Sequence, residues 1–239
     1  MCNLCSANSS RLSRRGLILG SAALAGAAAI SSHVAWAKAV APQNAIGPDE
    51  ALKRLMEGNA RYAANTSANQ DYSAGRAAHV NAQYPVAAIL SCADARVAPE
   101  LAFDQAPGDL FVVRVAGNFV NEDGLASFEY AVKYLNTPLL MVLGHSNCGA
   151  VAATIKVLKD GVTLPGHLQD MIREIKPAVV TAKKAKPADL LSAAIEDNIR
   201  RAVHRLETAT PILAESVKSQ KVKVVGAHYD LATGNITLV

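Results

Sequence analysis

Four short apolar runs recur from residue 86 onward, and each is bounded by glycine, proline or polar residues. They have the length of buried strands and cover residues 86–90, 111–115, 139–143 and 222–225. Stretches with apolar residues at helical spacing lie between them, at residues 125–135, 150–158 and 190–206. Because strand-like and helix-like segments alternate, the sequence predicts an α/β fold with a mainly parallel β-sheet flanked by helices.

The remaining segments complete one domain. A helix is expected to begin near residue 48, where two acidic residues precede a spaced apolar face. Residues 59–82 are polar and irregular, and the lysine-rich stretch 183–186 is expected in a solvated loop between helices. With no internal repeat and no linker, residues 49–239 are predicted to form a single domain.

The first 37 residues have the pattern of an export signal. Their only charged residues are Arg11, Arg14 and Arg15, and the uncharged, Ala/Gly-rich run 16–37 ends in an A-x-A site. The arginine pair resembles a twin-arginine (Tat) signal, so we expect cleavage after Ala37 and Tat export of a bacterial protein that becomes periplasmic or secreted. Residues 38–48 would then form a flexible lead-in, and the mature form would have no stable membrane span. An uncleaved membrane anchor is the alternative.

Composition narrows the classes of protein further. The chain is 51% hydrophobic and 18% charged, which excludes a disordered protein. Three of its four net positive charges belong to the predicted signal, and no cluster of basic and aromatic residues follows. We therefore expect no nucleic-acid partner.

Two strings of reactive residues directly follow apolar runs. The first holds Cys92, Asp94 and Arg96, which alternate and so point the same way in an extended segment. The second holds His145 and Cys148, three positions apart at a predicted strand-to-helix turn. Carboxyl ends of strands are where open α/β sheets place their sites. Two cysteines and one histidine form a soft donor set suited to zinc, with one position left for water or substrate.

Spacing alone leaves alternatives open. Cys92 could be a nucleophile with His145 as its base, or these residues could be ordinary core residues. A structural zinc site would need a fourth ligand, and only Asp94 is near in sequence. In an exported protein, Cys92 and Cys148 could also form a disulfide.

The strings C-x-D-x-R and H-x-x-C resemble those of the β-class carbonic anhydrases. Further similar segments follow in the family's order over about residues 48–239: 52–59, 108–118, 128–132, 144–151 and 226–230. The resemblance implies the family's fold and the reversible hydration of CO2 to bicarbonate and a proton. It implies one Zn²⁺ per chain, held by Cys92, His145 and Cys148. It also implies self-association to a dimer or tetramer with clefts at the subunit interface.

The resemblance also assigns roles around the metal. Asp94 would orient a zinc-bound hydroxide toward CO2, and Arg96 would hold Asp94 away from the metal. Gln83 stands nine positions before Cys92, like the substrate-binding glutamine of the plant-like subgroup, and Phe111 and Tyr130 match its cleft aromatics. Gln83 favours the open, constitutively active site over a site closed by Asp94.

Two other functions fit the same residues. A zinc hydrolase of the same fold could act on CS2 or COS, since a fold does not fix a substrate. A non-catalytic zinc-binding module is the other alternative, but such a module would not need Asp94, Arg96 and Gln83. No other histidine stands out as a proton shuttle.

Overall fold

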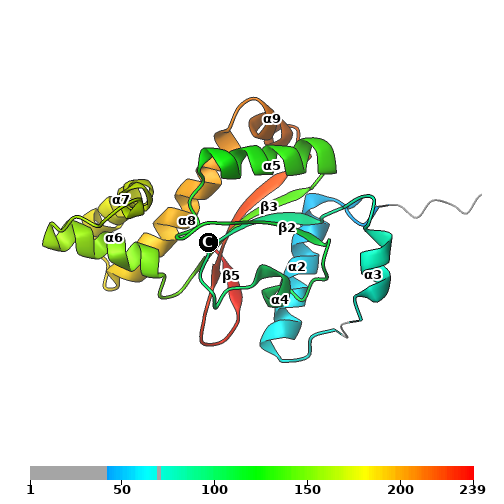
Figure 1. Ribbon diagram of the computed structural model, residues 1–239, viewed down its shortest axis with the longest axis horizontal. Helices are drawn as coiled ribbons and strands as arrows, with labels where there is room; N and C mark the ends of the chain where they lie inside the picture. The colour runs from blue at the N-terminus through cyan, green and yellow to red at the C-terminus, as the bar shows by residue number, and fades with distance from the viewer. Residues whose placement is uncertain (1–41, 69–70) are drawn as a thin grey trace, which may run out of the picture. The chain divides into compact units, whose positions relative to one another are not determined.

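A five-stranded sheet forms the centre of the computed structural model (Figure 1). The model describes residues 42–68 and 71–239, within a unit that runs from Ala41 to Val239. The strand order is β2-β1-β3-β4-β5. The strands are β1 (Ala87–Ser91), β2 (Leu110–Arg114), β3 (Leu139–His145), β4 (Lys223–Tyr229) and β5 (Ile236–Leu238). β1 to β4 pair in parallel and β5 is antiparallel to β4, which confirms the predicted mainly parallel sheet.

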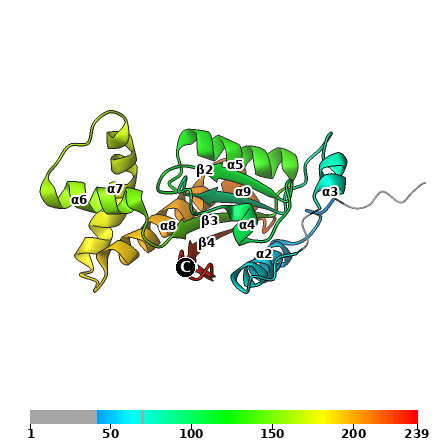
Figure 2. The same cartoon turned by 60° about the horizontal axis from the view of Figure 1, so that its bottom comes forward.

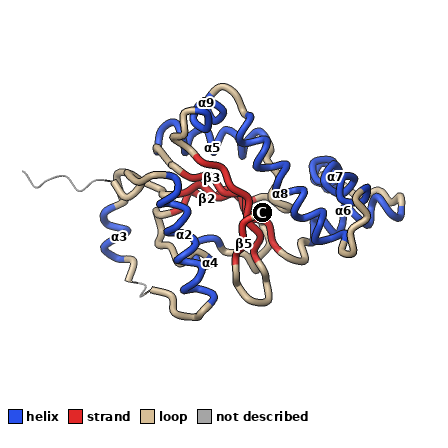
Figure 3. Tube along the Cα trace, turned by 180° about the vertical axis from the view of Figure 1, so that it is seen from behind, coloured by secondary structure: helices blue, strands red, loops and turns tan. Residues whose placement is uncertain are grey.

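Helices cover both faces of this sheet (Figure 2). The helices are α2 (Pro48–Ala63), α3 (Ser73–Ala78), α4 (Pro99–Ala102), α5 (Glu122–Leu135), α6 (Gly149–Asp160), α7 (Leu168–Lys184), α8 (Leu190–Thr208) and α9 (Ile212–Lys218). One core joins α5, α8 and α9 to the sheet, and the other joins α2 and α4 to its opposite face. α6 and α7 pack beside the end of α8 (Figure 3).

β3 shows why the central strands are apolar along their whole length. All seven of its residues are buried. Leu140 and Val142 face the core with α5 and α8, whereas Leu139 and Met141 face the core with α2. A parallel strand that is covered on both faces has no side exposed to water, so it reads as a continuous apolar run.

The structure corrects two predictions about polar segments. Residues 59–82 are not wholly irregular, because α2 continues to Ala63 and α3 forms within them. Asn59 sits buried in α2 because its amide bonds to Ala102 O at 2.9 Å and to Gly234 O at 2.8 Å. The stretch 183–186 is not all loop either, because its first two lysines end α7, where cations favour a helix C-terminus.

The start of the described chain is packed against the domain. Asn44 is 7% exposed, and its Nδ2 lies 2.5 Å from Leu135 O. These contacts correct the predicted flexible lead-in from about Asn44 onward, and its earlier part lies outside the described residues together with the predicted signal 1–37. Among the helices that are described, none has the length and apolar character to cross a membrane.

Candidate metal centre

The carboxyl edge of the sheet brings the two strings of reactive residues together. Cys92 directly follows β1, His145 ends β3, and Cys148 precedes the first residue of α6. Because β1 and β3 are parallel neighbours, their carboxyl ends meet at one edge. The potential ligand atoms of the three residues lie within 4.8 Å of one another, and the side chains are 4%, 0% and 1% exposed. The predicted Cys/His/Cys cluster therefore exists as a buried group.

The turn between His145 and Cys148 is fixed by the neighbouring strand. Ser146 N donates to Tyr229 O at 3.0 Å, and Ser146 Oγ accepts from Leu231 N at 2.9 Å. Asn147 takes a left-handed conformation with φ +54°, which a short polar side chain tolerates. These contacts let the chain turn within two residues, so that both ligands face the same centre.

The histidine offers one free lone pair to this centre. His145 Nδ1 lies 2.9 Å from Ser146 O, so Nδ1 carries the proton and donates it to that carbonyl. Its Nε2 is buried and has no hydrogen-bond partner among residues 42–68 and 71–239. A buried acceptor without a partner is costly unless a ligand completes it. The residues therefore fit a zinc ion, which binds imidazole nitrogen and thiolate sulfur.

The two sulfurs are free thiols, so the alternative of a disulfide is wrong. A hydrogen bond from the Cys148 thiol lowers the pKa of Cys92. The same contact, together with burial, raises the pKa of Cys148. A divalent cation would favour the thiolate form of both sulfurs.

Asp94 and Arg96 form the predicted ion pair beside the cluster. Asp94 Oδ1 accepts from Arg96 Nε at 2.9 Å and Oδ2 accepts from Arg96 Nη2 at 2.7 Å, a two-point contact. These bonds lower the pKa of Asp94 below its ordinary range, so the carboxylate stays ionised. Asp94 Oδ2 is 3.8 Å from His145 Nε2, which places a fixed negative acceptor next to the free lone pair.

Three supporting residues had no predicted role. Arg114 donates from Nε to Cys92 O at 3.1 Å and from Nη2 to Asp94 O at 2.8 Å. Gly117 N donates to Cys92 Sγ at 3.2 Å, and Asn198 in α8 donates to Gly117 O at 2.8 Å. The sequence contains a signal for a supporting role of two of these residues. Arg114 belongs to the apolar run that becomes β2, and Asn198 is a polar residue on the apolar face of a predicted helix.

The predicted pocket residues lie elsewhere in the same chain. Gln83 is exposed in the loop before β1, so the whole strand separates it from Cys92. Phe111 pairs with Ala88 near the start of β1, and its ring is 6.4 Å from that of Tyr130. With a rise of about 3.3 Å per residue, the five residues of β1 span about 16 Å, and Gln83 stands before the first of them. One chain alone does not bring them to the cluster.

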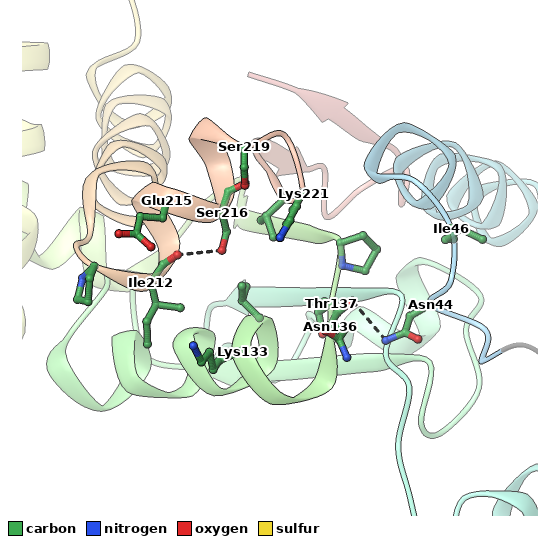
Figure 4. Close-up of a pocket in the computed structure, with 14 residues that line it drawn as sticks. Asn44, Ile46, Lys133, Asn136, Thr137, Ile212, Glu215, Ser216, Ser219 and Lys221 are labelled. Atoms are coloured by element: carbon green, nitrogen blue, oxygen red, sulfur yellow. Dashed lines mark hydrogen bonds between the residues drawn. The ribbon is translucent and has the colours of Figure 1, made fainter.

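A cavity of about 760 Å³ also lies away from the cluster (Figure 4). It is lined by the residues just before β3 and β4, the end of α5, and α9. These are the amino ends of the strands, whereas the cluster stands at the carboxyl ends. The cavity is therefore separate from the candidate metal centre.

Comparison with known proteins identifies the family. The model of the family described as carbonic anhydrase matches residues 87–236. Carbonic anhydrase 2 of Mycobacterium tuberculosis is 38% identical over 196 residues, which cover 79% of this chain and 91% of that protein.

Solved structures agree with this result. The β-carbonic anhydrase of Coccomyxa, solved in complex with acetazolamide, has a TM-score of 0.61 and 27% identity, and the match covers 79% of this chain and 86% of that one. A β-carbonic anhydrase of Sordaria macrospora, described as tetrameric, has a TM-score of 0.62 with 80% and 97% covered; at 22% identity it supports the fold alone. This chain, which carries both motifs on that fold, belongs to the β-carbonic anhydrase family.

Proposed function

We propose that this carbonic anhydrase hydrates CO2 reversibly to bicarbonate and a proton, using one zinc ion held by Cys92, His145 and Cys148. The observation that carries the proposal is the buried cluster itself. Its three donor atoms lie within 4.8 Å of one another, and His145 Nε2 has no partner in the described chain. A zinc ion bound there would act as a Lewis acid that makes water more acidic.

The ion pair beside the cluster supplies the orientation that the reaction needs. Both carboxylate oxygens of Asp94 accept hydrogen bonds from Arg96, and one of them faces the cluster. A carboxylate that is held in this way accepts a hydrogen bond from the reacting oxygen in one direction only. This contact would direct a lone pair of that oxygen at an incoming CO2. Arg96 thus fixes the position of Asp94, and Asp94 fixes the position of the reacting oxygen.

The same contact favours an open site at neutral pH. Asp94 would have to leave three hydrogen bonds with Arg96, two from the guanidinium and one from the backbone N–H, before it could bind the metal in place of water. A rate profile between about pH 6.5 and 9 tests this, because an open site loses activity gradually as pH falls, with the ionisation of a single group. An abrupt, cooperative loss below about pH 8 would instead indicate closure by Asp94.

A second copy of the chain would complete the substrate pocket. Phe111 is half-buried at the sheet edge, and Tyr130 and Tyr134 are 46% and 70% exposed on the adjacent helix α5. β2 is an edge strand with one side unpaired in the described chain. Self-association along this edge would bring Gln83, Phe111 and Tyr130 of one copy toward the cluster of the other. The Sordaria macrospora structure of the same fold is itself described as tetrameric.

Stopped-flow measurement of CO2 hydration on the zinc-loaded protein tests the proposal. We expect fast hydration that is lost on metal removal and returns with added zinc. COS and CS2 provide the comparison substrates. If the protein turned over COS or CS2 faster than CO2, it would be a hydrolase and the proposal would be wrong. If it turned over none of the three, it would be a non-catalytic zinc-binding module.

We also propose that the chain is exported in folded form, with zinc bound. Free thiolates are at risk in an oxidising compartment, and zinc binding would protect Cys92 and Cys148 during transit. The twin arginines Arg14 and Arg15 support this route. Replacing both with lysine should leave zinc-loaded precursor in the cytoplasm. Normal export of that variant would contradict the route.

A further inference from the structure

Asn198 is a buried amide on the otherwise apolar face of α8. Its neighbours on that face include Ile195, Ile199 and Ala202, and it is 4% exposed. Its Nδ2 donates to Gly117 O at 2.8 Å, a contact between residues that are 81 positions apart in sequence. A buried amide costs free energy unless it is bonded, so this single contact is the reason that the position tolerates a polar residue.

Gly117 is held from several sides at once. Its φ is +88°, a conformation that favours glycine, and an added Cβ would lie 2.5 Å from Ile175 Cδ1 and 3.1 Å from Ala150 Cβ. While its carbonyl accepts from Asn198, its N–H donates to Cys92 Sγ at 3.2 Å. The position of this N–H is therefore set by packing on α6 and α7 and by one hydrogen bond to α8.

We propose that Asn198 is a positioning residue for the metal centre: by holding the carbonyl of Gly117, it keeps the N–H of Gly117 directed at the sulfur of Cys92. The inference rests on the proposed zinc site and deepens it. A hydrogen bond to a coordinating thiolate withdraws electron density from the sulfur and fixes its orientation. Partners of metal ligands typically change metal affinity by about 10- to 100-fold when they are removed.

A purely structural role makes a different prediction. If Asn198 only satisfied a carbonyl and filled space, its removal would lower the melting temperature without changing the electronic state of Cys92. The test must therefore measure the electron density at the sulfur of Cys92. Cobalt(II) in place of zinc allows this measurement, because sulfur-to-cobalt charge-transfer absorption depends on the electron density at the thiolate.

Asn198→Leu removes the donor and keeps the number and branching of the side-chain heavy atoms. We expect the charge-transfer band of the cobalt-loaded variant to move to longer wavelength, and its zinc affinity to fall about 10-fold. The control is Leu206→Val on the same helix, a core change without contact to Gly117, which should lower stability and leave band and affinity unchanged. An unchanged band and affinity in folded Asn198→Leu would overturn the proposal.

Two further measurements keep the proposal testable if Asn198→Leu does not fold. Asn198→Ala removes the same donor without adding a branched side chain and should give the same shift. In the wild-type protein loaded with ¹¹³Cd, the amide proton of Gly117 should show scalar coupling to the metal through the sulfur of Cys92. The absence of that coupling would overturn the proposal without any variant. A wild-type protein that binds no zinc, cobalt or cadmium would refute the zinc site itself, which distinguishes the two failures.

Discussion

The two edges of the sheet differ in how complete they are within one chain. At the carboxyl edge, Cys92, His145 and Cys148 are buried, and the surrounding backbone groups are bonded by Arg114 and Ser146. At the amino edge, Gln83 is exposed, and the cavity of about 760 Å³ is separate from the metal cluster. The ligand set is thus assembled within one chain, whereas the pocket predicted around it is not.

The difference shows which parts of the proposed active site a single chain can supply. Parallel strands end at a common edge, so residues that follow two neighbouring strands meet without any help from a partner. The half-buried Phe111 on edge strand β2 and the exposed Tyr130 and Tyr134 on α5 contact one another, but they leave apolar surface that nothing in the described chain covers. We therefore expect variants at the carboxyl edge to act within one chain and variants at Gln83 to act across a subunit interface.

Removing a metal ligand should have the largest effect. Cys148→Ala deletes one of three donors, and since a four-ligand zinc site contributes about 10–16 kcal/mol, we expect zinc affinity to fall by roughly a thousand-fold or more. Metal analysis after dialysis should find no retained zinc, and CO2 hydration should be lost. Cys2→Ala with Cys5→Ala is the matched control, because these cysteines lie in the predicted signal and should not affect zinc. Full zinc retention in Cys148→Ala would refute the site.

Breaking the ion pair should reduce activity and leave the metal in place. In Arg96→Ala, the pKa of Asp94 rises toward its ordinary value because the guanidinium hydrogen bonds, the largest cause of its lowering, are gone, while the backbone N–H at position 96 still donates. Asp94 is then free to approach the metal, and we expect the rate of CO2 hydration to fall by about 100-fold with zinc retained. Asp94→Asn should behave similarly.

Arg200→Ala, which removes an exposed ion pair with Glu196, is the control for the loss of a surface charge. It should keep the wild-type hydration rate. Wild-type rates in Arg96→Ala and Asp94→Asn as well would show that the pair beside the cluster is only a structural salt bridge.

The metal ligands could be predicted from the sequence because their neighbours in sequence determine their positions. Cys92 directly follows β1, and His145 is the last residue of β3. Buried parallel strands are the elements that the apolar runs of the sequence predict most reliably. The contact of Asn198 with Gly117 spans 81 positions and depends on how α8 packs on the sheet, so no local pattern predicts it.

Two elements that the sequence did not predict, α7 and β5, have identifiable causes. α7 has apolar residues at helical spacing, but Pro177 stands inside it, and a proline normally ends a predicted helix. β5 has only three residues, and Ile236 is the one that is buried. Its place is set by tertiary contacts, since Asn59 Oδ1 accepts from Ile236 N at 2.8 Å.

Complementation tests whether the pocket is built across subunits. Gln83→Ala should retain zinc and lose about 10-fold in hydration rate, since one hydrogen bond to the reacting group contributes about 1–1.5 kcal/mol. When Gln83→Ala and Cys148→Ala chains are refolded together, each mixed dimer contains one site with an intact cluster and an intact glutamine. Random pairing in a two-fold symmetric dimer should then restore about a quarter of the wild-type rate.

The two parent variants, each refolded alone, are the controls for this experiment. Mixing them without refolding gives the baseline for this experiment, because any gain there measures the exchange of subunits between folded dimers. If the co-refolded mixture is no more active than the parents together, Gln83 does not act in a site across the interface.

Removing Arg114 should have the smallest effect and tests whether the carboxyl edge is completed within one chain. Its guanidinium donates to Cys92 O and Asp94 O, so it holds the segment that carries both a ligand and the orienting carboxylate. Because the side chain is exposed, we expect Arg114→Met to cost about 1 kcal/mol and to lower Tm by about 2–4 °C. Zinc binds the same segment, so the loss of this support should also weaken zinc affinity a few-fold, and the decrease in Tm should be larger with zinc than without it. Thermal unfolding of both forms, compared with Arg200→Met, measures this difference, and an equal decrease with and without zinc would show that Arg114 supports the fold and not the metal centre.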